Sequence, residues 1–318
     1  MNGLQKSLAI GYVLAISGGI FWAVGGACGQ YLFQHNSMTS NWLVPIRLST
    51  AGCILLAFSL LRRQNIWLVW QNKQNVFDIL LFGLLGSALC QYAYYSSIQY
   101  SNVALATVLA YMSPAMILVY TVCKEKRLPH LYETLCVLLV IAGAFTCATH
   151  LHPQSLAVTP QALLWGLISA AAFAIYTMQP QRLMQQFDLL VVIGWGMLIG
   201  GGALLLLFRP WNINVVVNST LFLNMSVVIF FGTVCSFCFY QAGVSIVGSI
   251  TGSILSSVEP VASMILSVLF LHVPLTALDF LGFLLILATI PIIALGNGRR
   301  QHQQTTQSSQ HSKAHGNN

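Results

Sequence analysis

The stretch "ILSSVEPVAS" (254–263) places a carboxylate, Glu259, inside a long apolar run. Between Arg209 and Asp279 the chain has no other Lys, Arg, Asp or Glu. A charged side chain at the centre of a membrane helix costs about 2.5–3.5 kcal/mol on insertion scales, so such residues are rare and usually functional. Glu259 therefore indicates either a site on a transport pathway or a group that holds a broken helix in shape.

The composition is that of a membrane protein. Of the 318 residues 57% are hydrophobic and only 6% are charged, whereas a soluble domain has about 25% charged residues. The net charge of +7 does not indicate a nucleic-acid partner, because the basic residues fall in short clusters between apolar runs. The eight cysteines lie within or beside these runs, which is typical of small apolar residues rather than a disulfide framework.

The apolar runs predict an all-α membrane protein with ten transmembrane helices. A helical span needs about 20 apolar residues, and the runs are continuous rather than alternating as in transmembrane β-strands. The predicted spans are 8–33, 42–61, 77–99, 102–123, 131–149, 161–180, 189–208, 221–244, 249–271 and 276–296.

The basic residues predict the orientation of these spans. With both termini cytoplasmic, only Arg47 and Arg209 fall outside the inner loops and tails, so 11 of the 13 Lys and Arg residues (13 − 2) are on the inner side. This bias follows the positive-inside rule and predicts a multi-pass protein of the bacterial cytoplasmic (inner) membrane. The polar segment 301–318 is predicted to be a disordered cytoplasmic tail.

The two halves of the chain are predicted to be inverted repeats, 8–149 and 161–296. A shift of 146 positions (260 − 114) brings "YMSPAMIL" (111–118) onto "SVEPVASM" (257–264), so that Ser113 falls on Glu259 and Pro114 on Pro260. Five spans are an odd number, so the second copy must enter the membrane upside down. Inverted repeats are typical of secondary transporters, whose substrate site lies at the midplane between the halves.

Glu259 is the first candidate for that site. Pro260 disfavours helical geometry in the preceding residue, so a kink is expected there. On a regular helix, small and mostly hydroxyl-bearing residues share the face of the acid: Ser249, Gly252, Ser256, Ser263 and Ser267. The functional interpretation is a site for a proton or a cationic substrate, which leaves proton coupling open.

Arg47 is the only basic residue inside a predicted span. It could bind a carboxylate substrate, pair with Glu259, or extend to the membrane interface. Tyr and Gln side chains within spans need polar partners, so some of them should line a cavity. The predicted pathway residues are Glu259, Pro260, Ser256, Trp22, Tyr111, Ser113, Pro114, Gln91, Tyr95, Tyr176, Gln241 and Arg47.

The chain resembles the EamA-type branch of the drug/metabolite transporter superfamily, and within it a bacterial inner-membrane permease subgroup. The resemblance rests on "LSSVEPVASMILSVLFL" (255–271), "FWA" (21–23), "PIRLSTAG" (45–52) and "TVLAYMSPAMILV" (107–119). It implies a carrier, often an exporter, with a central cavity made by spans 1, 3, 4, 6, 8 and 9 and with spans 5 and 10 at the periphery. Trp22-Ala23 departs from the Trp-Gly that is usual in the family.

The predicted function is secondary active export of small metabolites, such as amino acids or related amphipathic compounds, by alternating access. The alternative is an uncoupled facilitator or channel. An enzyme is not expected, because no second acid within a span pairs with Glu259 and no histidine lies at mid-span. No cofactor and no metal is expected. The expected partners are a small-molecule substrate and membrane lipid, and the carrier is expected to be a monomer or a homodimer.

Overall fold

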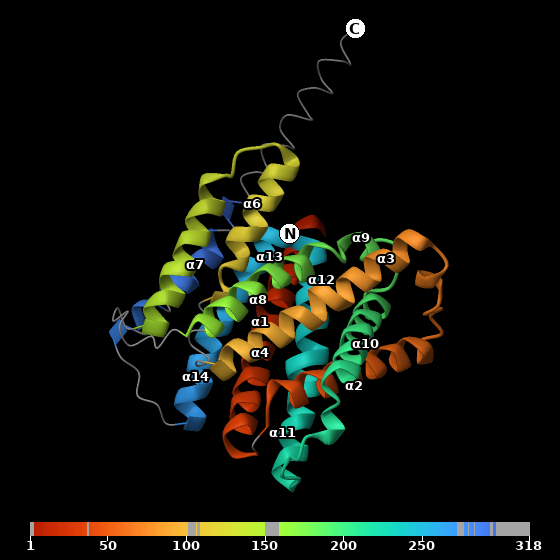
Figure 1. Cartoon of the computed structure of the whole chain (residues 1–318). Helices are drawn as coiled ribbons and strands as arrows, with labels where there is room; N and C mark the ends of the chain where they lie inside the picture. The colour runs from red at the N-terminus through yellow and green to blue at the C-terminus, as the bar shows by residue number, and fades with distance from the viewer. Residues whose placement is uncertain are drawn as a thin grey trace, which may run out of the picture.

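The computed structural model describes residues 3–36, 38–100, 106, 109–149, 159–271, 277–278, 280–282, 284–292 and 295–296. Across these residues the chain is helical and contains no strand, which confirms the predicted all-α class (Figure 1). The predicted cytoplasmic tail, 301–318, lies outside the described residues.

The helices follow the predicted apolar runs. In chain order they are α1 (Gly3–His35), α2 (Ser40–Leu61), η1 (Leu68–Trp70), α3 (Lys73–Leu81), η2 (Phe82–Ala88), α4 (Leu89–Tyr100), α6 (Ser113–Glu125), α7 (Leu131–Thr149), α8 (Pro160–Met178), α9 (Gln181–Met184), α10 (Leu189–Phe208), η4 (Pro210–Asn212), α11 (Ser219–Ile229), η5 (Phe230–Cys235), α12 (Ser236–Val247), α13 (Ser249–Leu255), η6 (Ser256–Val258) and α14 (Glu259–Leu271). The segments η2 and η5 are single π-helical stretches, whereas η1, η4 and η6 are 3₁₀ turns.

Within the described residues, six continuous helical segments are long and apolar enough to cross a membrane. They are Ser7–Phe33, Ser40–Leu61, Lys73–Tyr100, Pro160–Met184, Leu189–Phe208 and Ser219–Val247. They coincide with predicted spans 1, 2, 3, 6, 7 and 8. Two shorter apolar helices, Leu131–Gly143 and Phe280–Ile292, fall in predicted spans 5 and 10. Predicted span 9 is broken into α13, η6 and α14, so the count of ten spans stays a prediction.

The boundary between predicted spans 8 and 9 is a single glycine. Helix α12 ends at Val247 and α13 begins at Ser249. Gly248 between them has a φ of 84°, a left-handed conformation that side chains with a Cβ adopt rarely. The predicted break in "SIVG" (245–248) is thereby confirmed, and the backbone geometry explains why it falls at this residue.

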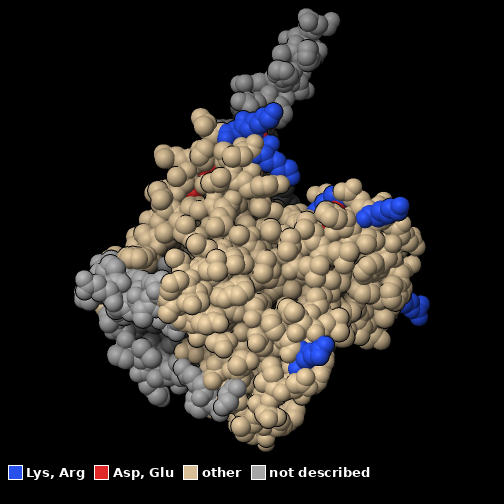
Figure 2. All heavy atoms as spheres, in the orientation of Figure 1, with Lys and Arg blue, Asp and Glu red and all other residues tan. Residues whose placement is uncertain are grey.

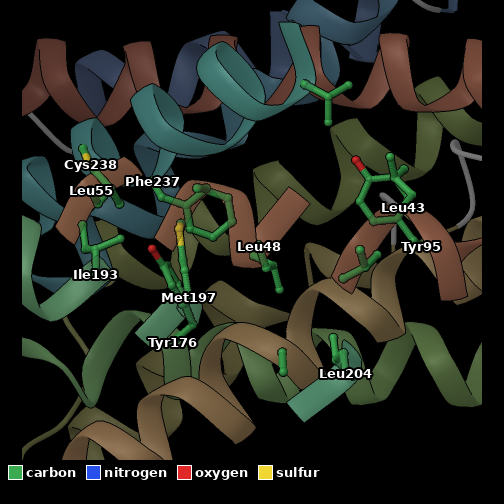
Figure 3. Packing of buried hydrophobic residues seen from close by; sticks show 14 of the residues in the cluster. Leu43, Leu48, Leu55, Tyr95, Tyr176, Ile193, Met197, Leu204, Phe237 and Cys238 are labelled. Carbon is green, nitrogen blue, oxygen red and sulfur yellow. The ribbon is translucent and has the colours of Figure 1, made fainter. Parts of the chain in front are cut away.

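Helices α2 and α10 pack closely along their length. Figure 3 shows Leu43, Leu48 and Leu55 of α2 in one buried cluster with Ile193 and Met197 of α10. Small residues allow the two backbones to approach one another. A Cβ added at Gly52 would lie 2.6 Å from the backbone nitrogen of Leu198. The glycines of "GWGMLIG" (194–200) also have close neighbours from other helices, so this run serves helix packing.

The remaining long helices form further pairs. Helix α1 packs against α12, and α4 packs against α8. Helix α7 lies against the segment 280–292: the thiol of Cys136 donates a hydrogen bond to the carbonyl oxygen of Thr289 over 3.6 Å. A Cβ added at Gly143 would lie 2.8 Å from the carbonyl oxygen of Gly282. On the face drawn in Figure 2, Lys and Arg atoms are few and leave a broad uncharged area in the middle.

Candidate functional site

A cavity of about 70 Å³ lies among the helices, which is room for several water molecules. Its lining comes from α1, α2, α4, the segment before and at the start of α6, α8, η5, and the three pieces of predicted span 9. The lining residues are Trp22, Gly26, Arg47, Cys90, Gln91, Tyr94, Tyr95, Ala110, Tyr111, Ser113, Ser169, Phe173, Gly232, Ser253, Ser256 and Glu259. Among the described residues none of the lining comes from α7 or from 280–292, as the family resemblance implies, but Arg47 of α2 lines the cavity although predicted span 2 is not among the spans that the resemblance places there.

The broken helix brings Glu259 to this cavity. Helix α13 ends at Leu255, the 3₁₀ turn η6 follows, and α14 starts at Glu259 itself. Pro260 is therefore in the first turn of α14, where its missing N–H breaks no helical hydrogen bond. A carboxylate in the first turn also interacts favourably with the helix dipole. The break that the Glu-Pro sequence predicts is present, and it falls just before the acid.

The 3₁₀ turn changes which residues share the face of the acid. Ser253 and Ser256, six and three residues before Glu259, line the cavity with it. Gly252, which a regular helix would place on that face, packs instead against Val244 of α12. The predicted stripe is therefore right for Ser256 and wrong for Gly252, because a 3₁₀ turn has three residues per turn rather than 3.6.

Glu259 has no protein partner in the described part of the chain. Its carboxylate forms none of the hydrogen bonds or ion pairs found there, and the residue is half-buried. The hydroxyls of Ser253 and Ser256 are directed to helix carbonyls, those of Ile250 and Ser253 respectively. The acid is thus open to a group that enters the cavity.

Arg47 is only 2% exposed, so the surrounding protein encloses its side chain. One terminal guanidinium nitrogen donates a hydrogen bond to the hydroxyl of Tyr95 over 2.8 Å, and the other donates to Oε1 of Gln91. The guanidinium carbon also lies 4.6 Å from the centre of the Tyr95 ring, within cation–π range. Among the described residues no acid pairs with Arg47, so the predicted alternative of an ion pair with Glu259 is not formed.

Trp22 is held by other aromatic rings. Its ring centre lies 4.8 Å from that of Tyr240, 5.3 Å from that of Phe237 and 5.6 Å from that of Phe173. The indole nitrogen Nε1 is buried and has no acceptor among the residues that the structure describes, and the same is true of Nε of Arg47. Both groups can only donate hydrogen bonds.

The structure brings eight of the twelve predicted pathway residues to the cavity: Glu259, Ser256, Trp22, Tyr111, Ser113, Gln91, Tyr95 and Arg47. Pro114 and Pro260 lie next to lining residues at the starts of α6 and α14. Tyr176 packs on Phe82 and Phe237 behind the cavity wall, and Gln241 donates a hydrogen bond to the Tyr176 carbonyl oxygen over 2.7 Å. Neither Tyr176 nor Gln241 lines the cavity.

Sequence reasoning missed eight lining residues, namely Gly26, Cys90, Tyr94, Ala110, Ser169, Phe173, Gly232 and Ser253. Helical spacing could have indicated some of them. Tyr94 is three residues after Gln91 on α4, and Phe173 is four residues after Ser169 on α8, so each pair shares one helix face. Glycine and alanine in an apolar helix carry no such signal.

These observations define a class of protein: a helical protein with several membrane-length helices and a cavity that is lined by an acid and an arginine. Comparison with known proteins gives the family. The sequence model of the EamA-like transporter family matches residues 9–149 and again 160–295. The chain belongs to this family, and the resemblance deduced from its motifs is confirmed.

A curated relative supports this assignment, and a solved structure shares the fold. The inner membrane transporter YicL of Salmonella typhimurium is 35% identical to the chain over 281 residues, which cover 88% of this chain and 94% of the relative. A solved crystal structure superposes with a TM-score of 0.73 at 16% identity, over 91% of this chain and 98% of that one. At this identity the likeness concerns the fold alone. Family and relative bear the names of transporters, not of enzymes.

Proposed function

We propose that the protein is a secondary transporter that exports small amphipathic metabolites across the bacterial inner membrane by alternating access. The single observation that carries the proposal is the cavity between the two segments that match the family. Trp22 and Arg47 come from the first matched segment, and Ser169 and Glu259 come from the second. A site shared by two halves can open to either side when the halves rock against each other.

The two halves are proposed to be five-helix repeats of inverted topology. Two breaks in helix geometry support this. The π-helical segments η2 and η5 begin at Phe82 and Phe230, a separation of 148 positions (230 − 82). Helices α6 and α14 begin at Ser113 and Glu259, a separation of 146 positions (259 − 113). Such breaks are uncommon in helices, so their recurrence at nearly one spacing favours a duplicated unit.

The helix pairs support the same proposal. If spans 1–5 correspond to spans 6–10, then α2 and α10 are equivalent helices, and they pack together. Likewise α7 packs against its proposed counterpart, 280–292. The α1–α12 pair (spans 1 and 8) corresponds to the α8–α4 pair (spans 6 and 3), and both pairs are present. A two-fold axis relating the halves would generate this set of contacts.

The proposed location is the inner membrane, as for the relative YicL, with both termini in the cytoplasm. Two ion pairs lie on the side that is proposed to be cytoplasmic. Arg182 pairs with Asp78 over 2.5 Å, and Arg127 pairs with Glu133 over 2.9 Å. All these residues lie at helix ends or loops that the positive-inside rule assigns to the cytoplasmic side.

Glu259 is proposed to exchange a proton, or to bind a cationic group of the substrate, during transport. The support is its lack of a protein partner in the described residues and its place at a helix break. Discontinuous helices of this kind carry the coupling sites of many transporters. An uncoupled facilitator would use the same acid only to shape its pore.

The test starts with cells. An untargeted comparison of metabolites excreted with and without the protein identifies the exported compound, whose movement is then measured in proteoliposomes at several pH values. We expect Glu259→Gln to reduce transport and to flatten its pH dependence, and Glu125→Gln, at an exposed acid, to leave both unchanged. Normal transport by Glu259→Gln with an unchanged pH profile would exclude Glu259 as the coupling residue.

Counterflow distinguishes the carrier from the facilitator alternative. An alternating-access carrier loaded with unlabelled compound accumulates the labelled compound transiently and saturates. A channel shows neither accumulation nor saturation, and this result would overturn the proposed mechanism while keeping the protein in its family.

A further inference from the structure

We propose that the ligand of the cavity carries a carboxylate and that Arg47 binds it, with the indole of Trp22 as a second donor. This inference rests on the proposed transport function, because the cavity is taken to be the substrate site. It goes further by naming the chemical class of the substrate and the residues that recognise it.

The state of Arg47 is the first reason. The side chain is 2% exposed and lines the cavity, and within the described residues its hydrogen-bond acceptors are the neutral groups of Tyr95 and Gln91 alone. A buried cation is normally paired with an anion. In the described part of the chain no carboxylate pairs with Arg47, so the missing counter-charge is best supplied by a ligand.

The unused donors are the second reason. A guanidinium has five N–H groups, and the two hydrogen bonds to Tyr95 and Gln91 leave Nε without an acceptor. Nε1 of Trp22, in the same cavity lining, is also buried without an acceptor. Buried donors without partners are rare in native structures and need an explanation. A ligand rich in acceptor oxygens gives one.

Arg47 is fixed in place by residues of another helix. The ring of Tyr95 lies under the guanidinium, and it also contacts the rings of Phe33 and Tyr94 at centre distances of 5.7 and 5.4 Å. Gln91 is one helical turn away on α4, so both partners hold the guanidinium from one side. Tyr95 and Gln91 are therefore positioning residues, and the planar fork of Arg47 suits a planar carboxylate.

Charge selects a monoanion over a dianion. The cavity contains one arginine and one acid, Glu259, so a doubly charged phosphate would meet one cation and a second negative group. A carboxylate matches the single positive charge. The aromatic residues Trp22, Tyr94 and Phe173 line the same cavity and provide apolar surface for the body of the molecule, as in most small-ligand sites.

The experiment measures ligand-induced shifts in the melting temperature of the purified full-length protein in lipid nanodiscs. The probes are small carboxylates, each paired with its primary amide: L-leucine, 4-methylpentanoate and phenylacetate with their amides, and inorganic phosphate as the dianion. The variants are Arg47→Gln and Arg47→Lys. Arg62→Gln is the matched control, because Arg62 is exposed just beyond the end of the same helix.

We expect at least one carboxylate to stabilise the wild type and Arg62→Gln, and its amide and phosphate to have no effect. In Arg47→Gln the apparent Kd of that carboxylate should rise about tenfold or more, because a charge-assisted contact is lost. In Arg47→Lys the rise should be smaller, because the charge remains. Each variant is compared with its own ligand-free melting temperature, which separates loss of binding from loss of fold.

Three results would overturn the proposal. Equal stabilisation by an amide and its carboxylate would show that charge is not recognised. Undiminished carboxylate binding by Arg47→Gln would remove Arg47 from the site. If no carboxylate raised the melting temperature, the proposed substrate class would be wrong. If a carboxylate bound in an Arg47-dependent way but the protein transported nothing in proteoliposomes, only the proposed transport function would be overturned. Failure of the ligand proposal and failure of the transport proposal are therefore distinguishable.

Discussion

Two adjacent glycines of α10 offer a matched test of the contact between the halves. Gly201 faces α2: a Cβ added there would lie 2.9 Å from Cα of Ser49 and 2.5 Å from its hydroxyl oxygen. Gly202, the next residue on the same helix, has no atom within 4 Å of an added Cβ. The variants Gly201→Ala and Gly202→Ala therefore add the same methyl group to a closed and to an open position.

The size of the effect follows from these contacts. Both substitutions replace glycine by alanine in a helix, which stabilises by up to about 1 kcal/mol. Only Gly201→Ala also forces two backbones apart, and overpacking by a methyl group costs about 1–3 kcal/mol. The helix-propensity contribution cancels between the two variants. We expect Gly201→Ala to be less stable than Gly202→Ala by about 1–3 kcal/mol.

Unfolding of both variants by titration with a denaturing detergent in mixed micelles measures this difference. The wild type should lie between the two or close to Gly202→Ala. Equal unfolding free energies for the two variants would refute the reasoning, because α2 and α10 could then not be in backbone contact at Ser49. A loss of transport in Gly201→Ala alone would add that this contact is needed for movement of the halves.

Two further predictions concern the ion pair between Asp78 and Arg182 and the helix break at Glu259. Asp78→Asn removes the ion pair with Arg182, which joins α3 to α9 on the proposed cytoplasmic side. We expect a small maleimide added from that side to modify the cavity residue Cys90 faster, as measured by peptide mass spectrometry. An unchanged rate would show that the ion pair does not limit access to the cavity. Pro260→Ala removes the residue that favours a break at Glu259, so we expect a slower transport rate at normal expression and folding, and a wild-type rate would show that the break does not depend on proline.

Much of the fold could be predicted from the sequence, because burial in lipid demands long apolar helices that are visible in composition alone. The predicted spans 42–61 and 189–208 coincide almost residue for residue with α2 and α10. The π-helical segments η2 and η5 were not predictable. They shift the register by one residue inside an apolar run, and nothing in "FGLLGSA" (82–88) changes hydropathy at that point.

Site residues could be predicted where the side chain is energetically unfavourable in a membrane helix, and less well where the residue type is common in such helices. Glu259 and Arg47 stand out because charges are rare in spans, and both line the cavity. Tyr176 was a reasonable candidate by the same argument for polar aromatic residues, yet it packs behind the wall on Phe82. Tyrosine has a large apolar ring that packs well anywhere in a core, so its presence in a span says little about which way it faces.

Glu259 and Arg47 have opposite charges, line one cavity, and do not pair. If stability alone had shaped the cavity, apolar residues of similar size would serve as well as or better than buried charges. A buried Arg47 and a half-buried Glu259, each lacking a charged partner in the described residues, are favourable only if another group can satisfy them. A substrate carboxylate bound to Arg47 and a proton bound to Glu259 would do so. Binding of the substrate and binding of the proton could then affect one another.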